Sequence, residues 1–207
     1  MGPDEILAES FRLIEAEVSP HPFDAAEWPV VRRMIHASGD LGLVRDVAFS
    51  AGAAAAGVRA LREGTPIVTD VRMVAVGVHR PSLEALGIGL HCFIDDAEVG
   101  RLAEAAGQTR SWCAMEKAIS AVGDAVYVIG NAPTALLALC AGVRRGAVRP
   151  RLVVAMPVGF VAVAESKEEA LALGVPVLAV RGRKGGSAMA AAAVNALLRL
   201  AREGLPR

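Results

Sequence analysis

The apolar residues of this chain fall into short continuous runs separated by glycine, proline and polar residues. Three of these runs are rich in β-branched residues, at positions 125–129, 152–156 and 176–180. Runs of this length without polar alternation are typical of strands that are covered on both faces. Two further strands are expected at 66–69 and 88–94, so the pattern predicts five strands in total.

Segments with helical periodicity separate these strands. Residues 3–18 are predicted to form an amphipathic helix, because apolar side chains recur there every three or four positions. The next predicted helix contains Val30 to Ile35 and brings His36 to its end. Further helices are expected at 50–63, 70–77, 108–121, after Thr134, from Ser166 or Glu168 to Leu173, and after Ser187.

Strands that alternate with helices along the whole chain indicate an α/β fold. We expect a three-layer, doubly wound, flavodoxin-like arrangement around a mainly parallel five-stranded sheet. Residues 1–207 are expected to form a single domain, with an N-terminal helical extension at 1–49 that carries His36 and an α/β core at 50–200.

The charge balance excludes several classes of partner. The chain has 22 basic and 22 acidic residues, so it has no overall field to attract nucleic acid or an anionic membrane. The longest apolar stretch, around 121–143, is interrupted by polar residues and proline, and no leader segment is apparent. We therefore expect a cytoplasmic protein that binds anions only locally.

The sequence provides no recognisable metal or cofactor motif. Its four histidines and three cysteines lack the spacing of a zinc site, and no glycine-rich dinucleotide or P-loop motif is present. No nucleophile motif is present either. These absences favour acid or base catalysis on an anionic substrate, with no cofactor and no bound metal.

His36 is the main catalytic candidate. Histidine ionises near neutral pH and can give or take a proton, and this one lies where a helix ends before Ser38, Gly39 and Asp40. A hydrogen-bonded structural histidine is the alternative, and position alone leaves both open.

The turn after the strand at 125–129 is the first candidate anion site. Because turns at the carboxyl ends of parallel strands present backbone donors, we expect Gly130, Asn131, Ala132 and Thr134 to bind substrate. Asn131 or Thr134 is also expected to cap the following helix, with Pro133 in its first turn.

Basic residues elsewhere provide further candidates. The loop at 181–187 places cations beside a helix amino terminus, with glycines that allow close approach; its candidates are Arg181, Arg183, Lys184, Gly185, Gly186 and Ser187. An ordinary solvated loop is the alternative. Arg110 opposes the dipole of its own helix, which suggests another partner. Ser10 lies on the inward stripe of its helix, as a core serine or a ligand contact.

Five motifs in order, from about Ser10 to Leu197, resemble the precorrin-8X methylmutase family, which includes the cobalt-precorrin-8 methylmutases. They lie at 34–39, 109–111, 130–135, 156–161 with 165–167, and 181–187. One departure is Ala162, where the family often has Gly or Asn.

The resemblance implies an isomerase of cobalamin biosynthesis that moves a methyl group from C-11 to C-12 of the corrin macrocycle. It also implies that His36 is the general acid on a ring nitrogen, that the protein is a homodimer with sites near the subunit interface, and that the product passes to neighbouring pathway enzymes. Two alternatives remain open: a non-catalytic corrinoid carrier, and a nucleotide-phosphate-binding domain based on the 181–187 loop alone.

Overall fold

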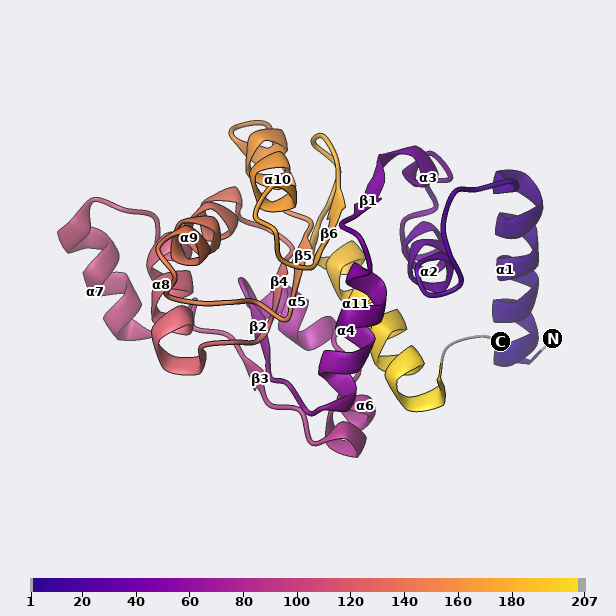
Figure 1. The fold of residues 1–207 in the computed structure, drawn as a ribbon, viewed down its shortest axis with the longest axis horizontal. Helices are drawn as coiled ribbons and strands as arrows, with labels where there is room; N and C mark the ends of the chain where they lie inside the picture. Colours follow the sequence, from indigo (N-terminus) through magenta and orange to yellow (C-terminus); the bar gives the residue numbers. More distant parts are fainter. Residues whose placement is uncertain (1, 205–207) are drawn as a thin grey trace.

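The computed structural model describes residues 2–204 and contains a six-stranded mixed sheet in the order β1-β6-β5-β4-β2-β3 (Figure 1). Five neighbouring strands are parallel, and β1 pairs antiparallel with β6 at one edge. The strands are β1 (Val47–Phe49), β2 (Ile67–Thr69), β3 (Leu90–His91), β4 (Val126–Ile129), β5 (Leu152–Ala155) and β6 (Val177–Val180).

The prediction of five strands was therefore wrong by one. β1 has only three residues and follows a short helix, so it lacks the long apolar run that marked the central strands. Because β1 belongs to the sheet, the helical extension ends before Val47 and not at residue 49. The strand expected at 88–94 has only two residues, since the Asp96 N–H donates to the Phe93 carbonyl and the chain turns there.

Helices connect the parallel strands and extend the amino terminus. They are α1 (Pro3–Val18), α2 (Trp28–Ser38), α3 (Leu43–Asp46), α4 (Ala53–Arg62), α5 (Arg72–Gly77), α6 (Arg80–Leu86), α7 (Ala97–Ala106), α8 (Arg110–Val122), α9 (Pro133–Arg144), α10 (Val163–Leu171) and α11 (Ser187–Glu203). The periodicity analysis missed α3, α6 and α7. The start of α7 does carry a capping signal, because the Asp96 carboxylate accepts the Glu98 N–H at 3.0 Å.

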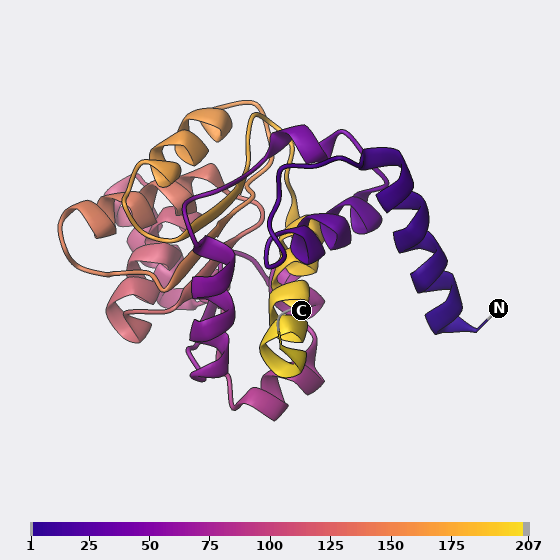
Figure 2. The same ribbon diagram turned by 45° about the vertical axis from the view of Figure 1, so that its right-hand side comes forward.

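Successive residues of the central strands pack on opposite faces of the sheet. In β4, Val126 and Val128 join the apolar cluster formed with α2, α4 and α11, whereas Tyr127 and Ile129 join the cluster formed with α8, α9 and α10. All four side chains are fully buried, which explains why the strand sequence shows no polar alternation. Figure 2 shows the two groups of helices around the sheet.

The amino-terminal helix α1 lies away from the rest of the fold. It buries no residue of its own, and Ile6 and Leu13 are 51% and 47% exposed. Its contact with α2 includes a hydrogen bond from the Trp28 indole to Glu15 at 2.9 Å. Figures 1 and 2 show α1 at one end of the molecule, adjacent to α2. Within residues 2–204, no helix is both long and apolar enough to cross a bilayer.

Ser50 fixes the end of the added strand β1 to β6. Its N–H donates to the Val177 carbonyl at 2.9 Å, and its hydroxyl accepts the Val177 N–H at 2.9 Å. Val177 is fully buried, so its N–H depends on this acceptor.

We predict that Ser50→Ala lowers the free energy of unfolding by about 1–3 kcal/mol, because the Val177 N–H then lacks a partner. Urea denaturation measures the change. Ser120→Ala, at an exposed serine of α8, is the control and should change stability by less than about 0.5 kcal/mol. Equal effects of the two substitutions would contradict the role of Ser50.

Candidate active site

The buried carboxylate of Asp70 organises the rim formed by the carboxyl ends of the parallel strands. Asp70 follows β2, and its two oxygens accept backbone N–H groups of the turn after β4: Gly130 at 2.9 Å, Asn131 at 2.9 Å and Ala132 at 2.8 Å. Burial raises the pKa of the Asp70 carboxyl, and the three donors oppose that increase. The carboxylate thus occupies the position that an anionic ligand would take at this turn.

These contacts correct the expectation that the turn donors bind substrate. The N–H groups of Gly130, Asn131 and Ala132 are already used by Asp70. The capping expectation was also wrong: Ala132 is the N-cap of α9, and neither Asn131 nor Thr134 caps it through a side chain. The Asp70 carboxylate, which follows the neighbouring strand β2, binds the turn that precedes α9 and, in the described chain, accepts no N–H group from the first turn of that helix.

Gly130 has a packing role. A Cβ atom there would lie 2.5 Å from Val74 Cγ2 and 2.9 Å from the Cα of Ser187. Ser187 is itself buried at the start of α11. These two residues, expected to contact substrate, therefore hold α5 and α11 against the end of β4.

Arg110 lies beside this turn with its side chain exposed. Thr109 caps α8 by accepting the Trp112 N–H at 3.1 Å, and its hydroxyl donates to Thr134 at 2.9 Å. The amino termini of α8 and α9 are therefore adjacent. In the described part of the chain, the Arg110 side chain has no hydrogen-bond or ion-pair partner, so its charge is available to a ligand.

A buried lysine, Lys167, binds the backbone of the loop at 181–187. Lys167 is fully buried, and its ammonium donates to the carbonyls of Gly182 at 2.9 Å and Lys184 at 2.5 Å. Burial lowers the pKa of Lys167 to about 8. Gly185 packs so closely that an added Cβ would lie 2.4 Å from the Met156 carbonyl oxygen. The Gly186 N–H also donates to that carbonyl at 2.9 Å, so the loop is rigidly attached to the end of β5.

Two of the three cations of this loop have acidic partners. Arg181 pairs with Glu168 at 2.6 Å. Lys184 pairs with Asp40 and Asp46, each at 2.9 Å, and these partners raise its pKa. Because Asp40 follows α2 closely, Lys184 connects the loop to the segment that carries His36. Because both acidic partners occupy its ammonium, Lys184 fits a structural link between the loop and the α2 segment better than the substrate contact that we expected.

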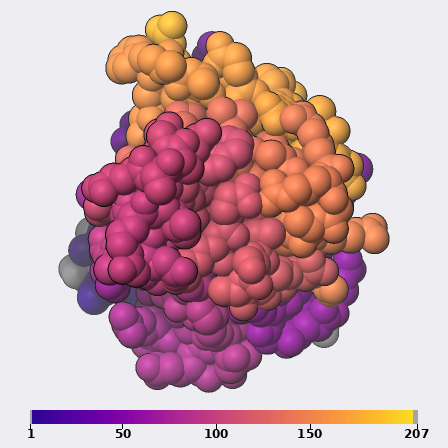
Figure 3. Space-filling model, turned by 90° about the vertical axis from the view of Figure 1, so that its left-hand side faces the viewer, coloured from indigo at the N-terminus to yellow at the C-terminus, as the bar shows by residue number. Residues whose placement is uncertain are grey.

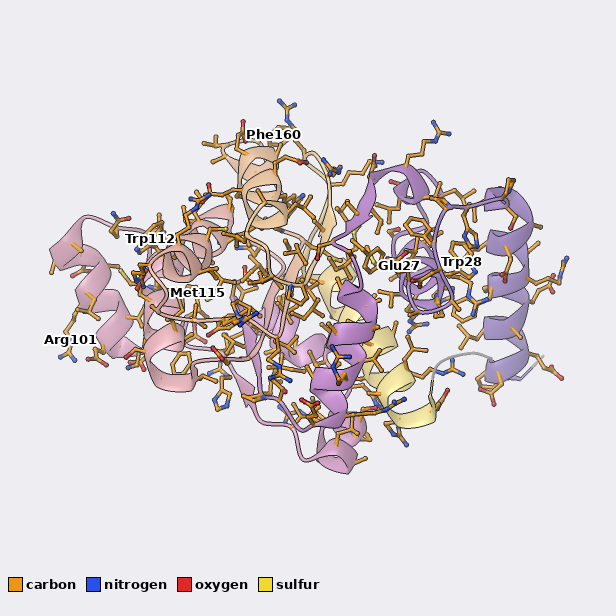
Figure 4. The ribbon with its side chains drawn as sticks, viewed as in Figure 1. Glu27, Trp28, Arg101, Trp112, Met115 and Phe160 are labelled. Carbon is orange, nitrogen blue, oxygen red and sulfur yellow. The ribbon has the colours of Figure 1, made fainter. Side chains whose placement is uncertain are left out.

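Arg183 has no acidic partner among residues 2–204. Its guanidinium lies 5.4 Å from the ring centroid of Phe160, in the loop before α10. Phe160 is 83% exposed (Figure 4), and Val161 beside it is 82% exposed. Within the described residues, Arg183 therefore presents a charge without an acidic partner next to the exposed apolar surface of Phe160, an arrangement that suits an anionic ring system.

His36 is exposed in the last turn of α2, where Gly39 ends the helix in a left-handed conformation. Its ring meets Phe11 of α1 edge-on, with centroids 5.6 Å apart. Desolvation lowers the pKa of His36, and the positive charge of Arg33 lowers it further. Ser10, one residue before Phe11, donates to the Ile6 carbonyl at 2.9 Å, which is the purely local bond foreseen as its alternative role.

His36 and Arg110 do not converge within one chain. α2 lies near one end of the long axis and α8 near the other, as Trp28 and Trp112 show in Figure 4. Viewed from the α8 end, in Figure 3, residues around 100 and 130 fill the front and the amino-terminal residues are visible only at the margin. The 181–187 loop contacts the segment after His36 through Lys184, whereas Arg110 lies next to the 130–134 turn, which Thr109 contacts through Thr134.

Comparison with known proteins identifies the family. The model of the precorrin-8X methylmutase family, CbiC, matches residues 5–200. The chain belongs to the precorrin-8X methylmutase family.

Relatives and solved structures agree with this assignment. The precorrin-8X methylmutase of Pseudomonas aeruginosa is 47% identical over 93% of this chain and 93% of the relative. The cobalt-precorrin-8 methylmutase of Priestia megaterium is 42% identical over 98% of this chain and 90% of the relative. A crystal structure of precorrin-8X methylmutase from Thermus thermophilus superposes with a TM-score of 0.89 at 42% identity, covering 97% of this chain and 99% of that one.

Two buried charges of this methylmutase site escaped the sequence analysis. Asp70 lies in none of the five motifs, whereas Lys167 belongs to the motif at 165–167 but was given no role of its own. The importance of Asp70 depends on a turn about 60 positions later, and that of Lys167 on a loop 15 to 17 positions later. A signal exists for Asp70, because an acid directly after a buried strand lies at the rim where ligands bind. Among residues 2–204, no group of three or more His, Cys, Asp or Glu side chains is placed to hold a metal.

We predict that Asp70→Asn lowers the free energy of unfolding by about 2–4 kcal/mol, since an amide supplies one acceptor oxygen and no charge to three N–H groups. Chemical denaturation measures the change. The control is Asp124→Asn, which alters a carboxylate that accepts one exposed N–H, from Arg149 at 2.8 Å. A loss at position 70 no greater than at position 124 would contradict the organising role of Asp70.

Proposed function

We propose that this protein is an isomerase of corrin-ring synthesis for cobalamin, which moves a methyl group from C-11 to C-12 of precorrin-8X or its cobalt form to give hydrogenobyrinate or cobyrinate. Membership of the methylmutase family carries the proposal. The exposed His36, beside an aromatic ring and without a hydrogen-bond partner among the described residues, supports it.

His36 is proposed as the general acid. A sigmatropic methyl shift requires no electron transfer and no enzyme nucleophile, and protonation of a ring nitrogen makes the conjugated system more electron-poor. A positioned acid contributes about 10²–10⁴-fold to a rate. Binding of the macrocycle in a reactive geometry supplies the rest.

The substrate carries many carboxylates, and Arg110 and Arg183 are its proposed partners at the rim. Both are without acidic partners in the described chain, whereas Arg181 and Lys184 are engaged by Glu168, Asp40 and Asp46. Guanidinium groups bind carboxylates through two parallel hydrogen bonds, which gives direction as well as attraction.

We also propose that the enzyme is a homodimer whose sites use residues from both chains. Two features support this arrangement. His36 is carried by α2 and Arg110 by α8, two helices that lie toward opposite ends of the molecule (Figure 1), and α1 exposes apolar side chains such as Ile6 and Leu13. In a two-fold dimer, the His36 end of each chain can meet the Arg110 end of its partner. The symmetry repeats this contact, so the dimer has two equivalent sites that each use both chains.

We further propose that the protein is cytoplasmic and that it passes its product to a neighbouring pathway enzyme. We also propose a flavodoxin-like grouping for its core. The parallel strands, counted along the chain, follow the order 2-1-3-4-5, which supports that grouping.

His36→Gln tests the catalytic proposal. We expect turnover of precorrin-8X to fall by at least about 10²-fold, with corrinoid affinity retained, because glutamine preserves size and polarity but cannot donate an acidic proton. Visible absorbance follows both conversion and binding. Normal turnover by this variant would contradict the acid role, and a wild type that shifts the substrate bands without making product would indicate the carrier alternative.

The pH dependence of kcat/KM provides a second test. A general acid acts in its protonated form, and burial and Arg33 keep the pKa of His36 below the ordinary value of 6.5. The rate constant should therefore decrease as pH rises through a value below 6.5. Steady-state rates between pH 5 and pH 9 measure this profile. A rate that is constant over that range would exclude His36 as the acid.

Mixing two inactive variants tests the shared site. We expect His36→Ala and Arg110→Ala each to lose activity alone. After joint unfolding and refolding, mixed dimers contain one site with both native residues, which restores roughly a quarter of the wild-type activity. Refolded single variants are the controls. No recovery, with dimers shown by light scattering, would mean that each site lies within one chain.

A further inference from the structure

A cavity lies on the side of α2 that faces α1 and α11. Its volume is about 670 Å³, and its walls come from α1, α2, α11 and the start of α6. Apolar side chains form part of the lining, including Leu7, Phe11 and Leu200. We call this cavity the basic pocket, because its charged lining residues are four arginines and one acid: Arg32, Arg33, Arg199, Arg202 and Glu203.

Two of its four arginines are neutralised by neighbouring acids. Arg32 pairs with Glu15 at 2.9 Å, and Arg199 pairs with Glu203 at 2.8 Å. Arg33 has no hydrogen-bond or ion-pair partner among residues 2–204. Within the described residues, Arg202 has no acidic partner and donates to the Ser82 hydroxyl at 3.3 Å. The pocket of a protein with zero net charge thus holds two uncompensated guanidinium groups, from α2 and α11.

The wall that carries Arg202 is preorganised by polar contacts. Ser82 is 4% exposed and also bonds to His79 Nδ1 at 2.8 Å. The His79 N–H donates to the Asn195 amide oxygen at 2.8 Å, and the Asn195 nitrogen donates to the Gly77 carbonyl at 2.8 Å. These bonds join the start of α6 to α11, so a ligand meets a fixed surface.

The basic pocket and His36 share a neighbour, Phe11, although His36 does not itself line the pocket. Phe11 lines the pocket, lies 4.4 Å from the Arg32 guanidinium, and also meets the His36 ring. Arg33 is close enough to His36 for its charge to lower the pKa of the imidazole. Arg32 and His36 are four positions apart on α2, so they lie on the same face of the helix.

We propose that the basic pocket binds carboxylate-bearing side chains of the tetrapyrrole whose ring lies at His36, with Arg33 and Arg202 as the pairing groups. The inference rests on the proposed function and extends the substrate site to residues that form none of the recognisable motifs. The apolar lining suits the methylene groups of acetate and propionate arms, and the two free guanidinium groups suit their carboxylates.

Binding of hydrogenobyrinate, followed by its visible absorbance, tests the pocket. We expect Arg33→Gln and Arg202→Gln each to raise Kd about tenfold, because each removes one charge-assisted hydrogen-bonding group. The double variant should also show a weaker dependence of Kd on salt concentration. Arg33→Lys and Arg202→Lys keep the charge and should recover part of the affinity.

Arg101→Gln is the matched control. Arg101 is exposed on α7, at the opposite end of the molecule from α1 and α2 (Figure 4). This variant should bind as the wild type does. Thermal unfolding of every variant verifies that the fold is kept.

The outcomes separate the two proposals. If the wild type converts precorrin-8X and the double glutamine variant binds the product with unchanged Kd, the pocket proposal is wrong and the methylmutase function stands. If the wild type does not convert precorrin-8X, the proposed function fails. Tenfold weaker binding in the arginine variants but not in Arg101→Gln establishes the basic pocket as part of the substrate site.

Discussion

The burial of Asp70 against three backbone N–H groups determines how this protein can recognise an anion. In many α/β folds the turn after a central strand uses its donors for a ligand. Here the donors of Gly130, Asn131 and Ala132 are satisfied within the protein. In the loop at 181–187, after β6, the carbonyls of Gly182 and Lys184 accept the buried ammonium of Lys167, and the Gly186 N–H donates to the Met156 carbonyl. The backbone of the rim is therefore a rigid scaffold, and recognition is left to side chains.

If side chains and not the backbone recognise the anion, the free cations of the chain become important. With equal numbers of acidic and basic residues, the chain cannot attract a polyacid by its overall field. Many of its arginines and lysines are paired, as Arg181 and Lys184 are. The cations that remain without an acidic partner in residues 2–204 include Arg33, Arg110 and Arg183. Local, uncompensated guanidinium groups on a neutral protein bind carboxylates without also attracting nucleic acid or membranes.

Much of the fold could be predicted from sequence because its main signals are local. The buried runs in β4, β5 and β6 and the apolar period of α1 lie within a few consecutive residues. β1 could not be predicted, since three residues become a strand only by pairing with β6, over 120 positions away. Ala162 shows an intermediate case. Its φ of 56° is left-handed, a conformation that Gly and Asn adopt more readily than Ala, which agrees with the Gly or Asn that the family resemblance led us to expect there.

The candidate site divides in the same way. The motif at 34–39 marked His36, and the structure gives it an exposed position near a cavity. The substrate role expected for the 130–134 backbone remains a prediction, and the structure argues against it for three donors, because Asp70 accepts the N–H groups of Gly130, Asn131 and Ala132. Lys184 looked like an anchor because its partners Asp40 and Asp46 lie about 140 positions earlier in the sequence. Local patterns identify which groups are able to bind an anion, and only tertiary contacts decide which of them remain free.

A reaction that needs a single proton donor places unusual demands on the rest of the chain. The proposed donor itself requires little: His36 lies in the last turn of a helix and faces solvent beside Phe11. Its position relative to the core depends on the segment that follows it, where Lys184 holds Asp40 and Asp46 while Lys167 holds the loop that carries Lys184. Because a misplacement of about 1 Å can cost roughly 10²-fold in rate, this chain of contacts is as necessary to the proposed chemistry as the imidazole. In the proposed mechanism the two lysines therefore act through the position of His36, and neither needs to contact the substrate.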